Sequence, residues 1–244
     1  MKLKQDGQYT PGREARWKEG IDLIMERLRG GTGDAPVKVL DVGCGDGYNY
    51  GFLLKKMGKE NISENFIEYH AIDNNQELEK IFNNSAVKFH LGNIENIKKT
   101  YASGYFDVII ASEIIEHIVN TDKFILDIKE VLNDHGLVYL TTPNLGSWHS
   151  ILSLMLGYQP LSTEISCLRS EFGKIPFAKK FYYDNVLMHV RAFTIKGLKD
   201  FLEYHGFRIE KTYGGGYTPI DKLIFGRLLV GLSPILKVII RKNI

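Results

Sequence analysis

Residues 39–47, which read VLDVGCGDG, constrain the fold of this 244-residue chain more than any other feature. The first half of the stretch is apolar, and the second half places glycine at positions 43, 45 and 47. This order predicts a buried strand that enters a glycine-rich turn and then a helix. Glycines in such a turn let the backbone bend sharply and let a ligand approach the main chain closely. The free N–H groups of the following helix favour an anionic group. The stretch therefore predicts a ligand site at the carboxyl end of a strand in an α/β fold.

Strand-like and helix-like segments alternate along the rest of the chain. Short apolar runs predict strands at 37–42, 67–73, 87–90, 106–111, 137–142, 207–213 and 235–241. Helical spacing predicts helices at 11–28, 48–57, 76–82, 122–132 (capped by Asn120 or Thr121), from the N-cap Thr194 to Gly206, and at 220–232. Glycines 214–216 predict a turn or a mobile loop. The alternation predicts a doubly wound, mostly parallel sheet with helices on both faces.

A second acidic position supports a nucleoside-containing ligand. Asp73 ends the second predicted strand, where a carboxylate can accept hydrogen bonds from both ribose hydroxyls. The glycine loop differs from the dinucleotide fingerprint G-x-G-x-x-G, because Tyr48 stands where the last glycine would be. Loop and carboxylate together predict a ligand that contains adenosine.

These motifs resemble those of class I S-adenosylmethionine-dependent methyltransferases. The run LDVGCGDG (40–47) is similar to motif I of the family, and HAID (70–73) to its acidic ribose site. In GNIEN (92–96), Asn93 replaces the Asp that often accepts from the adenine amino group, and its amide oxygen can still accept. The runs FDVIIASEIIEHI (106–118) and LNDHGLVYLTTPN (132–144) resemble the segments around the fourth and fifth strands. Residues 189–207 extend the resemblance to a subgroup that includes ubiquinone-pathway and glycan-modifying methyltransferases.

The resemblance implies a Rossmann-like, seven-stranded, mostly parallel sheet with a reversed last strand, and S-adenosylmethionine as cofactor. It also implies an N-terminal helix over the cofactor, from which an arginine could pair with the cofactor carboxylate. The residues expected to bind the cofactor are Asp41, Gly43, Cys44, Gly45, Gly47, Asp73, Asn74, Asn93, Ile94, Ala111 and Arg16.

The cofactor sets the chemistry that the protein has to perform. Its sulfonium methyl is already activated, so alignment of the acceptor supplies much of the rate. A hydroxyl acceptor also has to lose its proton to a base near the methyl. His117 is the expected base, because it follows the fourth strand at the carboxyl edge. In a second interpretation, Glu113, Glu116 and His117 resemble an E-x-x-E-H metal constellation, with His189 as a distant fourth ligand.

The sequence predicts one domain, 1–244, with two additions to the sheet. Residues 1–33 form a helical cover, and residues 144–190, too long for an ordinary connection, form an inserted lid that builds the acceptor site. Aromatic and polar side chains mix in this region, which suits sugars and flat rings. The residues expected to bind the acceptor are Asn144, Trp148, Tyr158, Tyr182, His189 and Arg191.

Composition narrows the partners of the chain. A net charge of +2 predicts no binding to nucleic acid, which leaves a small molecule, a sugar or a lipid-linked glycan as acceptor. The distant cysteines Cys44 and Cys167 predict neither a disulfide nor a zinc site, and indicate a reducing, cytoplasmic setting. Charges and a proline interrupt the apolar stretch 223–240, so it is not expected to span a membrane, but it could rest on an anionic one.

Three rival functions stay open. A nicotinamide-dependent oxidoreductase would use the same sheet, although residue 48 and the lack of a clear Tyr-x-x-x-Lys pair speak against it. A non-catalytic protein that binds S-adenosylmethionine would keep the same loop. An RNA methyltransferase would need more basic charge than this chain carries.

Overall fold

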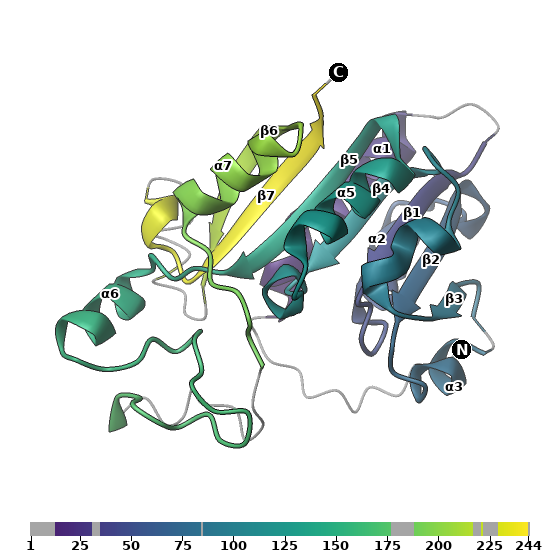
Figure 1. The fold of residues 1–244 in the computed structure, drawn as a ribbon. Helices are drawn as coiled ribbons and strands as arrows, with labels where there is room; N and C mark the ends of the chain where they lie inside the picture. The colour runs from purple at the N-terminus through teal and green to yellow at the C-terminus, as the bar shows by residue number, and fades with distance from the viewer. Residues whose placement is uncertain are drawn as a thin grey trace.

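The computed structural model describes residues 13–30, 35–83, 85–176, 188–216, 221 and 229–243. Figure 1 shows a single twisted sheet with helices packed against it. The strands are β1 (Val37–Val42), β2 (Ile67–Asp73), β3 (Lys88–Leu91), β4 (Phe106–Ser112), β5 (Leu132–Pro143), β6 (Phe207–Gly215) and β7 (Ile235–Lys242). The α-helices are α1 (Arg13–Gly30), α2 (Tyr48–Lys59), α3 (Leu78–Phe82), α4 (Ile97–Thr100), α5 (Thr121–Val131), α6 (Trp148–Met155) and α7 (Ile195–Tyr204). Short 3₁₀ turns are η1 (Glu64–Phe66), η2 (Ile94–Asn96), η3 (Ile115–His117) and η6 (Val230–Leu232).

The sheet has the predicted architecture. Its seven strands run in the order β3-β2-β1-β4-β5-β7-β6. Strands β1 to β5 pair in parallel, and β7 pairs antiparallel with both β5 and β6. The prediction of a doubly wound, mostly parallel sheet with one reversed strand is therefore confirmed. The order reverses at β1, so ligands are expected at the carboxyl ends of β1, β2 and β4.

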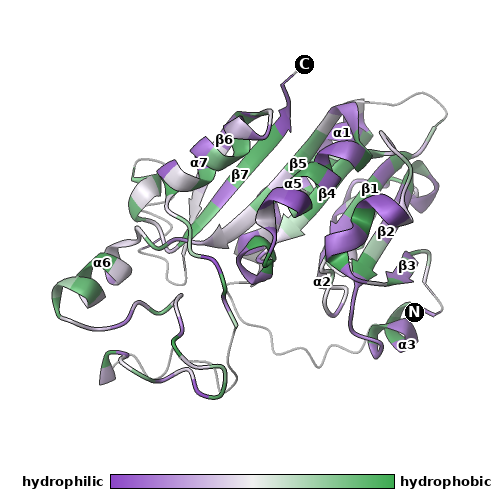
Figure 2. Cartoon of the chain, viewed as in Figure 1, coloured by the Kyte–Doolittle hydropathy of each residue, from purple (hydrophilic) through white to green (hydrophobic). Residues whose placement is uncertain are grey.

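Alternate residues of the central strands contribute to two separate cores. In β1, Val39 joins the cluster that contains α1 and α2, whereas Leu40 joins the cluster that contains α5 and α7. Successive side chains of a strand point to opposite faces, so both faces of β1 are covered. Figure 2 shows this apolar character along the central strands. The central strands are mostly apolar because helices bury both of their faces.

The ends of several elements follow the predicted caps. The side chain of Asn120 accepts from the backbone N–H of Lys123, and that of Thr194 accepts from Gly197. Gly206 adopts a φ of +77° just after α7, a conformation that glycine allows at low cost. The N-cap and C′ predictions at these positions are confirmed.

Three predicted boundaries differ in the structure. Helix α5 ends at Val131, and β5 starts at Leu132 rather than at 137, because Leu132 already pairs with Phe106 of β4. Gly214 and Gly215 were expected in a turn, but both pair with β7 as part of β6. Of the predicted helix 220–232, positions 220 and 222–228 lie outside the described residues, and η6 covers its end.

The chain leaves the sheet after β5 and returns to almost the same place. The N–H of Leu145 donates to the carbonyl of Phe193, and Asn144 forms a parallel bridge with that residue. Between these points lie α6 and residues 156–176, which project beyond the sheet (Figure 1). The joined ends support the interpretation of 144–190 as an insertion.

Candidate functional site

The glycine loop joins β1 to α2 in the predicted manner. Gly43, Gly45 and Gly47 all adopt positive φ, at +68°, +51° and +76°. L-residues with a side chain rarely adopt this conformation, so the sequence needs glycine at each position. Space for a side chain at Gly45 is open, with no atom within 4 Å of where a Cβ would lie. The backbone at Gly45 is therefore the part of the loop that a ligand can approach.

Gly43 has a different reason to lack a side chain. A Cβ at this position would lie 2.5 Å from Cδ1 of Ile114. Ile114 directly precedes η3, the turn that carries His117. The missing side chain therefore lets the turn after β4 pack directly on the glycine loop.

Asp73 connects the loop to the end of β2. One carboxylate oxygen accepts from the N–H of Gly45 at 3.1 Å, and the other accepts from Asn75 at 3.0 Å. The side chain is half-buried, and its neighbour Asn74 is exposed. A carboxylate held in this way keeps lone pairs for further donors, as a ribose would supply.

The segment after β3 lines the same edge. Asn93 is exposed, and its amide oxygen accepts from Glu95 at 2.8 Å, which caps η2. That oxygen has a second lone pair for another donor. Ile94 is partly buried and packs against the core. Both residues therefore lie where the sequence placed them, beyond the end of β3.

Asp41 points away from this edge. Its side chain is 1% exposed, and it accepts from Nδ2 of Asn49 and from the hydroxyl of Tyr69. Burial raises the pKa of Asp41 to about 6, despite these two donors. The expected direct contact with cofactor is thus not supported: Asp41 lies beneath the loop and ties β1 to α2 and β2. The sequence did not reveal the partners Asn49 and Tyr69. Side chains alternate along β1, however, so Asp41 is expected on the same face of the sheet as the buried Val39.

Two further expected cofactor residues are core residues. Ala111 is completely buried between β1 and β5, so its side chain cannot touch a ligand. The thiol of Cys44 is buried, and burial raises its pKa far above the usual range. Only the backbone of Cys44 can contribute to a ligand site here.

Helix α1, the described part of the predicted N-terminal cover, packs against one face of the sheet. It packs on α2, β1, β4 and β5. The backbone carbonyl of Arg16 accepts from the hydroxyl of Tyr139. The positive charge of Arg16 lies near enough to Glu116 to oppose the rise of its pKa. Arg16 therefore lies on the side of the helix that faces the turn after β4.

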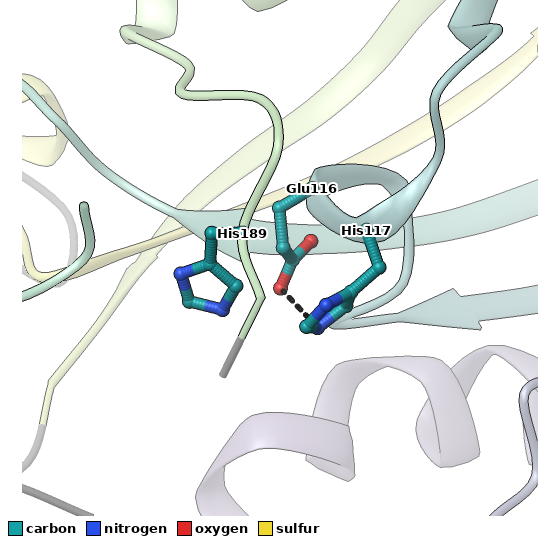
Figure 3. Close-up of side chains that lie close together, drawn as sticks. All are labelled: Glu116, His117 and His189. Carbon is teal, nitrogen blue, oxygen red and sulfur yellow. Dashed lines mark ion pairs between the residues drawn. The ribbon is translucent and has the colours of Figure 1, made fainter. Parts of the chain in front are cut away.

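The structure brings His117 together with a residue 72 positions later in the chain. The ring centroids of His117 and His189 are 4.8 Å apart. Glu116 completes the cluster, and its Oε1 lies 4.0 Å from Nε2 of His117. Figure 3 shows the three side chains converging from η3 and from the segment in which the insertion returns to the sheet. One potential ligand atom of each residue lies within 4.8 Å of the others.

Glu116 is the buried member of the cluster. Its side chain is 2% exposed, and Oε2 accepts from the hydroxyl of Thr142 at 3.0 Å. Among the described residues, Oε1 is buried with no hydrogen-bond donor. Burial raises the pKa of Glu116 well above its usual range, and the charge of Glu113 adds to the rise. A buried carboxyl oxygen that points at two imidazoles is suited to hold a proton or a cation.

The second imidazole is held in one orientation. Nδ1 of His189 lies 2.8 Å from the carbonyl oxygen of Ser162, which can only accept, so Nδ1 carries the proton. The other nitrogen then presents a lone pair, and Figure 3 shows it on the side of Glu116 and His117. The Ser162 turn is held in place by Lys174, whose amino group donates to the carbonyls of Pro160, Leu161 and Thr163. Sequence reasoning missed Ser162, because a backbone carbonyl leaves no signal in the sequence.

The backbone at Glu113 adds local strain to this turn. Glu113 has a φ of +55°, which is unfavourable for a residue with a side chain. Its N–H donates to Thr141, and the Thr141 hydroxyl donates back to the Glu113 carboxylate at 2.8 Å. These bonds hold Glu113 against β5. It therefore lies outside the cluster of Glu116, His117 and His189, although the family resemblance included it among the metal ligands.

The expected acceptor residues separate into several groups. Arg191 lies beside the cluster, because its N–H donates to the carbonyl of Glu116. Trp148 and Tyr158 are exposed on α6 and at its end. Tyr182 lies outside the described residues. Asn144 was expected to line the pocket, but it is fully buried and its amide binds the carbonyls of Gly231 and Ser233, so it is a structural residue.

Comparison with known proteins agrees with this architecture. The profile of a family described as "Methyltransferase domain" matches residues 10–212. The ubiquinone biosynthesis O-methyltransferase of Rickettsia prowazekii (strain Madrid E) is 26% identical over 128 residues, which cover 51% of this chain and 47% of that protein. The corresponding protein of Bartonella bacilliformis is 30% identical over 145 residues, covering 59% and 56%. The chain thus spans about half the length of the curated relatives it matches.

Solved structures share the fold at low identity. The 1,6-didemethyltoxoflavin-N1-methyltransferase of Burkholderia thailandensis, solved with S-adenosylhomocysteine, has a TM-score of 0.57 and 14% identity, over 98% of this chain and 83% of that chain. The PH0226 protein of Pyrococcus horikoshii has a TM-score of 0.59 and 16% identity, over 97% and 92%. At these identities the likeness shows the fold.

The matched profile covers most of the chain, from the covering helix to β6. It includes the glycine loop, the Asp73 carboxylate and the cluster around His117. The chain belongs to the class I methyltransferases, the family whose cofactor is S-adenosylmethionine.

Proposed function

We propose that the chain transfers the methyl group of S-adenosylmethionine to a hydroxyl group of a small acceptor. The observation that carries this proposal is the convergence of Glu116, His117 and His189 beside the glycine loop. Imidazole and carboxyl groups at this place can remove a proton from a hydroxyl. An amine acceptor would have less need of such a base. The names of the O-methyltransferases that the chain resembles agree with a hydroxyl acceptor.

The proposed cofactor site lies along the carboxyl ends of β1, β2 and β3. Gly45 offers open backbone, and the side-chain oxygens of Asp73 and Asn93, which already accept from Gly45 and Glu95, would accept from the ribose and from the adenine amino group. Arg16 on the covering helix pairs with the cofactor carboxylate. Bound cofactor supplies a methyl group that sulfur has already activated.

His117 is the proposed base. Its side chain is 33% exposed, so an acceptor can reach it, whereas Glu116 beside it is buried. In the transfer, the acceptor oxygen would bond to the methyl carbon as the carbon–sulfur bond breaks, and the acceptor proton would pass to a ring nitrogen of His117. His189 and Arg191 then bind the acceptor from the insertion. The acceptor is a sugar, a compound with a flat ring or a lipid-linked glycan, and the alternatives stay open.

A second candidate function for the same cluster is a metal-assisted transfer. The lone pair of His189 and the donor-free Oε1 of Glu116 both point toward His117, and the second nitrogen of His189 is fixed by a carbonyl. Histidine ligands are commonly oriented by such outer hydrogen bonds. Two imidazoles and one carboxylate suit zinc, manganese or iron, any of which would lower the pKa of a bound hydroxyl.

The test is a methylation assay on phenolic and sugar acceptors, with His117→Ala compared with His135→Ala, a control on an exposed histidine. We expect kcat to fall about 10²- to 10⁴-fold for His117→Ala and to stay unchanged for the control. An unchanged kcat for His117→Ala would refute the proposed base.

Chelator treatment separates the two mechanisms. Activity that survives chelation, with no bound metal by elemental analysis, supports direct proton transfer to His117. Activity that is lost on chelation and returns with Mn²⁺ or Zn²⁺ supports the metal-assisted reaction instead.

A further inference from the structure

Helix α6 turns its apolar side away from the protein. Ile151, Leu152 and Leu154 are 40%, 41% and 56% exposed, and Met155 is 79% exposed. A surface helix of a soluble domain normally buries this side and exposes its polar residues. Figure 2 shows the helix as an apolar element that projects away from the sheet.

The small polar residues of α6 face the protein. Ser147, Ser150 and Ser153 are at most 3% exposed, so they form the inner side. The hydroxyl of Ser147 donates to that of Ser150 at 2.8 Å, and the hydroxyl of Ser153 donates to the carbonyl of His149 at 2.8 Å. Because both hydrogen bonds lie within α6 and its N-cap, the serine side of the helix can be buried without leaving these hydroxyls unsatisfied.

The stretch of sequence that contains α6 is also uncharged. No Asp, Glu, Lys or Arg occurs between Asp134 and Glu164 in the sequence. The segment after the helix exposes Ile165 and Leu168, at 70% and 88%. Apolar surface on this scale marks an interaction site in a soluble domain.

We propose that the exposed side of α6 docks on the interfacial zone of a lipid bilayer. Two aromatic residues with polar atoms flank the apolar side: Trp148 at its start and Tyr158 just after its end, 42% and 37% exposed. The indole N–H of Trp148 donates to Asp221 at 3.0 Å, which leaves the ring as the apolar part to enter lipid. Trp and Tyr are enriched at this depth of a bilayer because one end of each is apolar and the other polar.

The size of α6 fits shallow insertion into a bilayer better than it fits a membrane span or an interface with a second copy of the chain. The helix has eight residues and is about 12 Å long, so it lies in the interface and does not span the bilayer. No helix among the described parts of the chain is long and apolar enough to cross a membrane. A second copy of the chain would need about 800 Å² on each partner, more than a helix about 12 Å long and about 10 Å wide offers.

Docking would also orient the proposed site. Helix α6 begins five residues after the end of β5, at the edge where Thr142 contacts Glu116. The carboxyl edge of the sheet would therefore face the lipid surface. The inference itself does not depend on methyl transfer, because it concerns only where the chain binds.

The test is co-sedimentation of the full chain with vesicles of phosphatidylcholine, alone and mixed with phosphatidylglycerol. We expect Leu154→Ser/Met155→Ser to weaken vesicle binding at least about tenfold, because both side chains lie on the exposed side. Leu126→Ser is the matched control, since this residue of α5 is 50% exposed elsewhere on the surface, and it should bind like the parent chain. Thermal melting should show no loss of fold in any variant.

Fluorescence gives a second readout of depth. The chain has two tryptophans, so Trp17→Phe leaves Trp148 as the single reporter. Lipids brominated in the acyl chain should quench Trp148 in the docked state. Absence of vesicle binding, equal loss in Leu126→Ser, or unquenched Trp148 overturns the proposal, as does a dimer that dissociates in the α6 variant.

Discussion

Nζ of Lys237, in the last strand, lies 2.8 Å from Oε2 of Glu19 in the first helix. The lysine side chain is 3% exposed, and Glu19 also accepts from the hydroxyl of Tyr139 at 3.3 Å. This contact joins the two ends of the described chain across the sheet. It fixes α1, the proposed cover of the cofactor, to the middle of β7.

We expect Lys237→Met to lower the free energy of unfolding by about 3 kcal/mol, because it leaves Glu19 without its buried cation. Urea unfolding would measure the change. Lys242→Met is the matched control, since it breaks an ion pair of β7 with Asp134, a residue that is 74% exposed. A surface pair of this kind contributes at most about 1 kcal/mol. Equal losses in the two variants would show that the Glu19 contact adds no special stability.

Gly45→Arg should abolish binding of S-adenosylhomocysteine, because the new side chain would fill the open space beside the loop backbone. Titration calorimetry would measure the affinity, with NAD titrated in parallel as the ligand of the rival oxidoreductase. Gly104→Arg is the control, since Gly104 also has positive φ and open space but lies before β4. Retained affinity in Gly45→Arg would exclude the loop as the cofactor site.

The buried carboxyl of Asp41 predicts a pH-dependent stability. Its pKa is about 6 in the folded chain and 3.8 in the unfolded one, so the folded state binds more protons between these values. The contribution of Asp41 to stability therefore falls as pH rises from 3.8 to 6. Relative to the parent, Asp41→Asn should gain about 3 kcal/mol between pH 3 and pH 7, as measured by urea unfolding. A difference between the two chains that is constant with pH would contradict the burial of this charge.

Glu68 predicts the opposite slope. Burial alone would raise its pKa, but hydrogen bonds from His70, Tyr105 and Lys88 outweigh burial and lower the pKa to about 2. The stabilisation is therefore complete above pH 4.5 and is lost as pH falls toward 2. In acid titrations followed by circular dichroism, Glu68→Gln should lose less stability than the parent over this range. A parallel loss in both chains would remove Glu68 as a source of acid sensitivity.

The sequence predicted the strands, the glycine loop and the family, because each has a local signal. The strands are continuous apolar runs, and three glycines with positive φ follow one of them. It did not predict the role of Asn144, whose partners Gly231 and Ser233 lie about ninety residues away. It also did not predict the orientation of α6, because helical periodicity defines two sides and leaves open which one faces the protein.

The residues of the candidate site also fall into those that the sequence could predict and those that it could not. Gly45, Asp73 and His117 could be found because strand ends meet at one edge of a parallel sheet. The contact between His117 and His189 required the insertion to return to its starting point, which no local pattern encodes. Asp41 and Ala111 were assigned to the cofactor from the motif alone, and the alternation of side chains along each strand turns both into the core.

The contact of Ile114 with Gly43 has a mechanical consequence. The Cα of the glycine and the side chain of Ile114, three residues before His117, pack so closely that no Cβ fits between them. A shift of the glycine loop when the cofactor binds would therefore reach the turn that holds His117, the residue proposed to meet the acceptor. The glycine loop and the turn that carries His117, which are far apart in the sequence, thus share one packed contact. Only the hydrogen atom of a glycine fits at this contact, where any other residue would place a side chain.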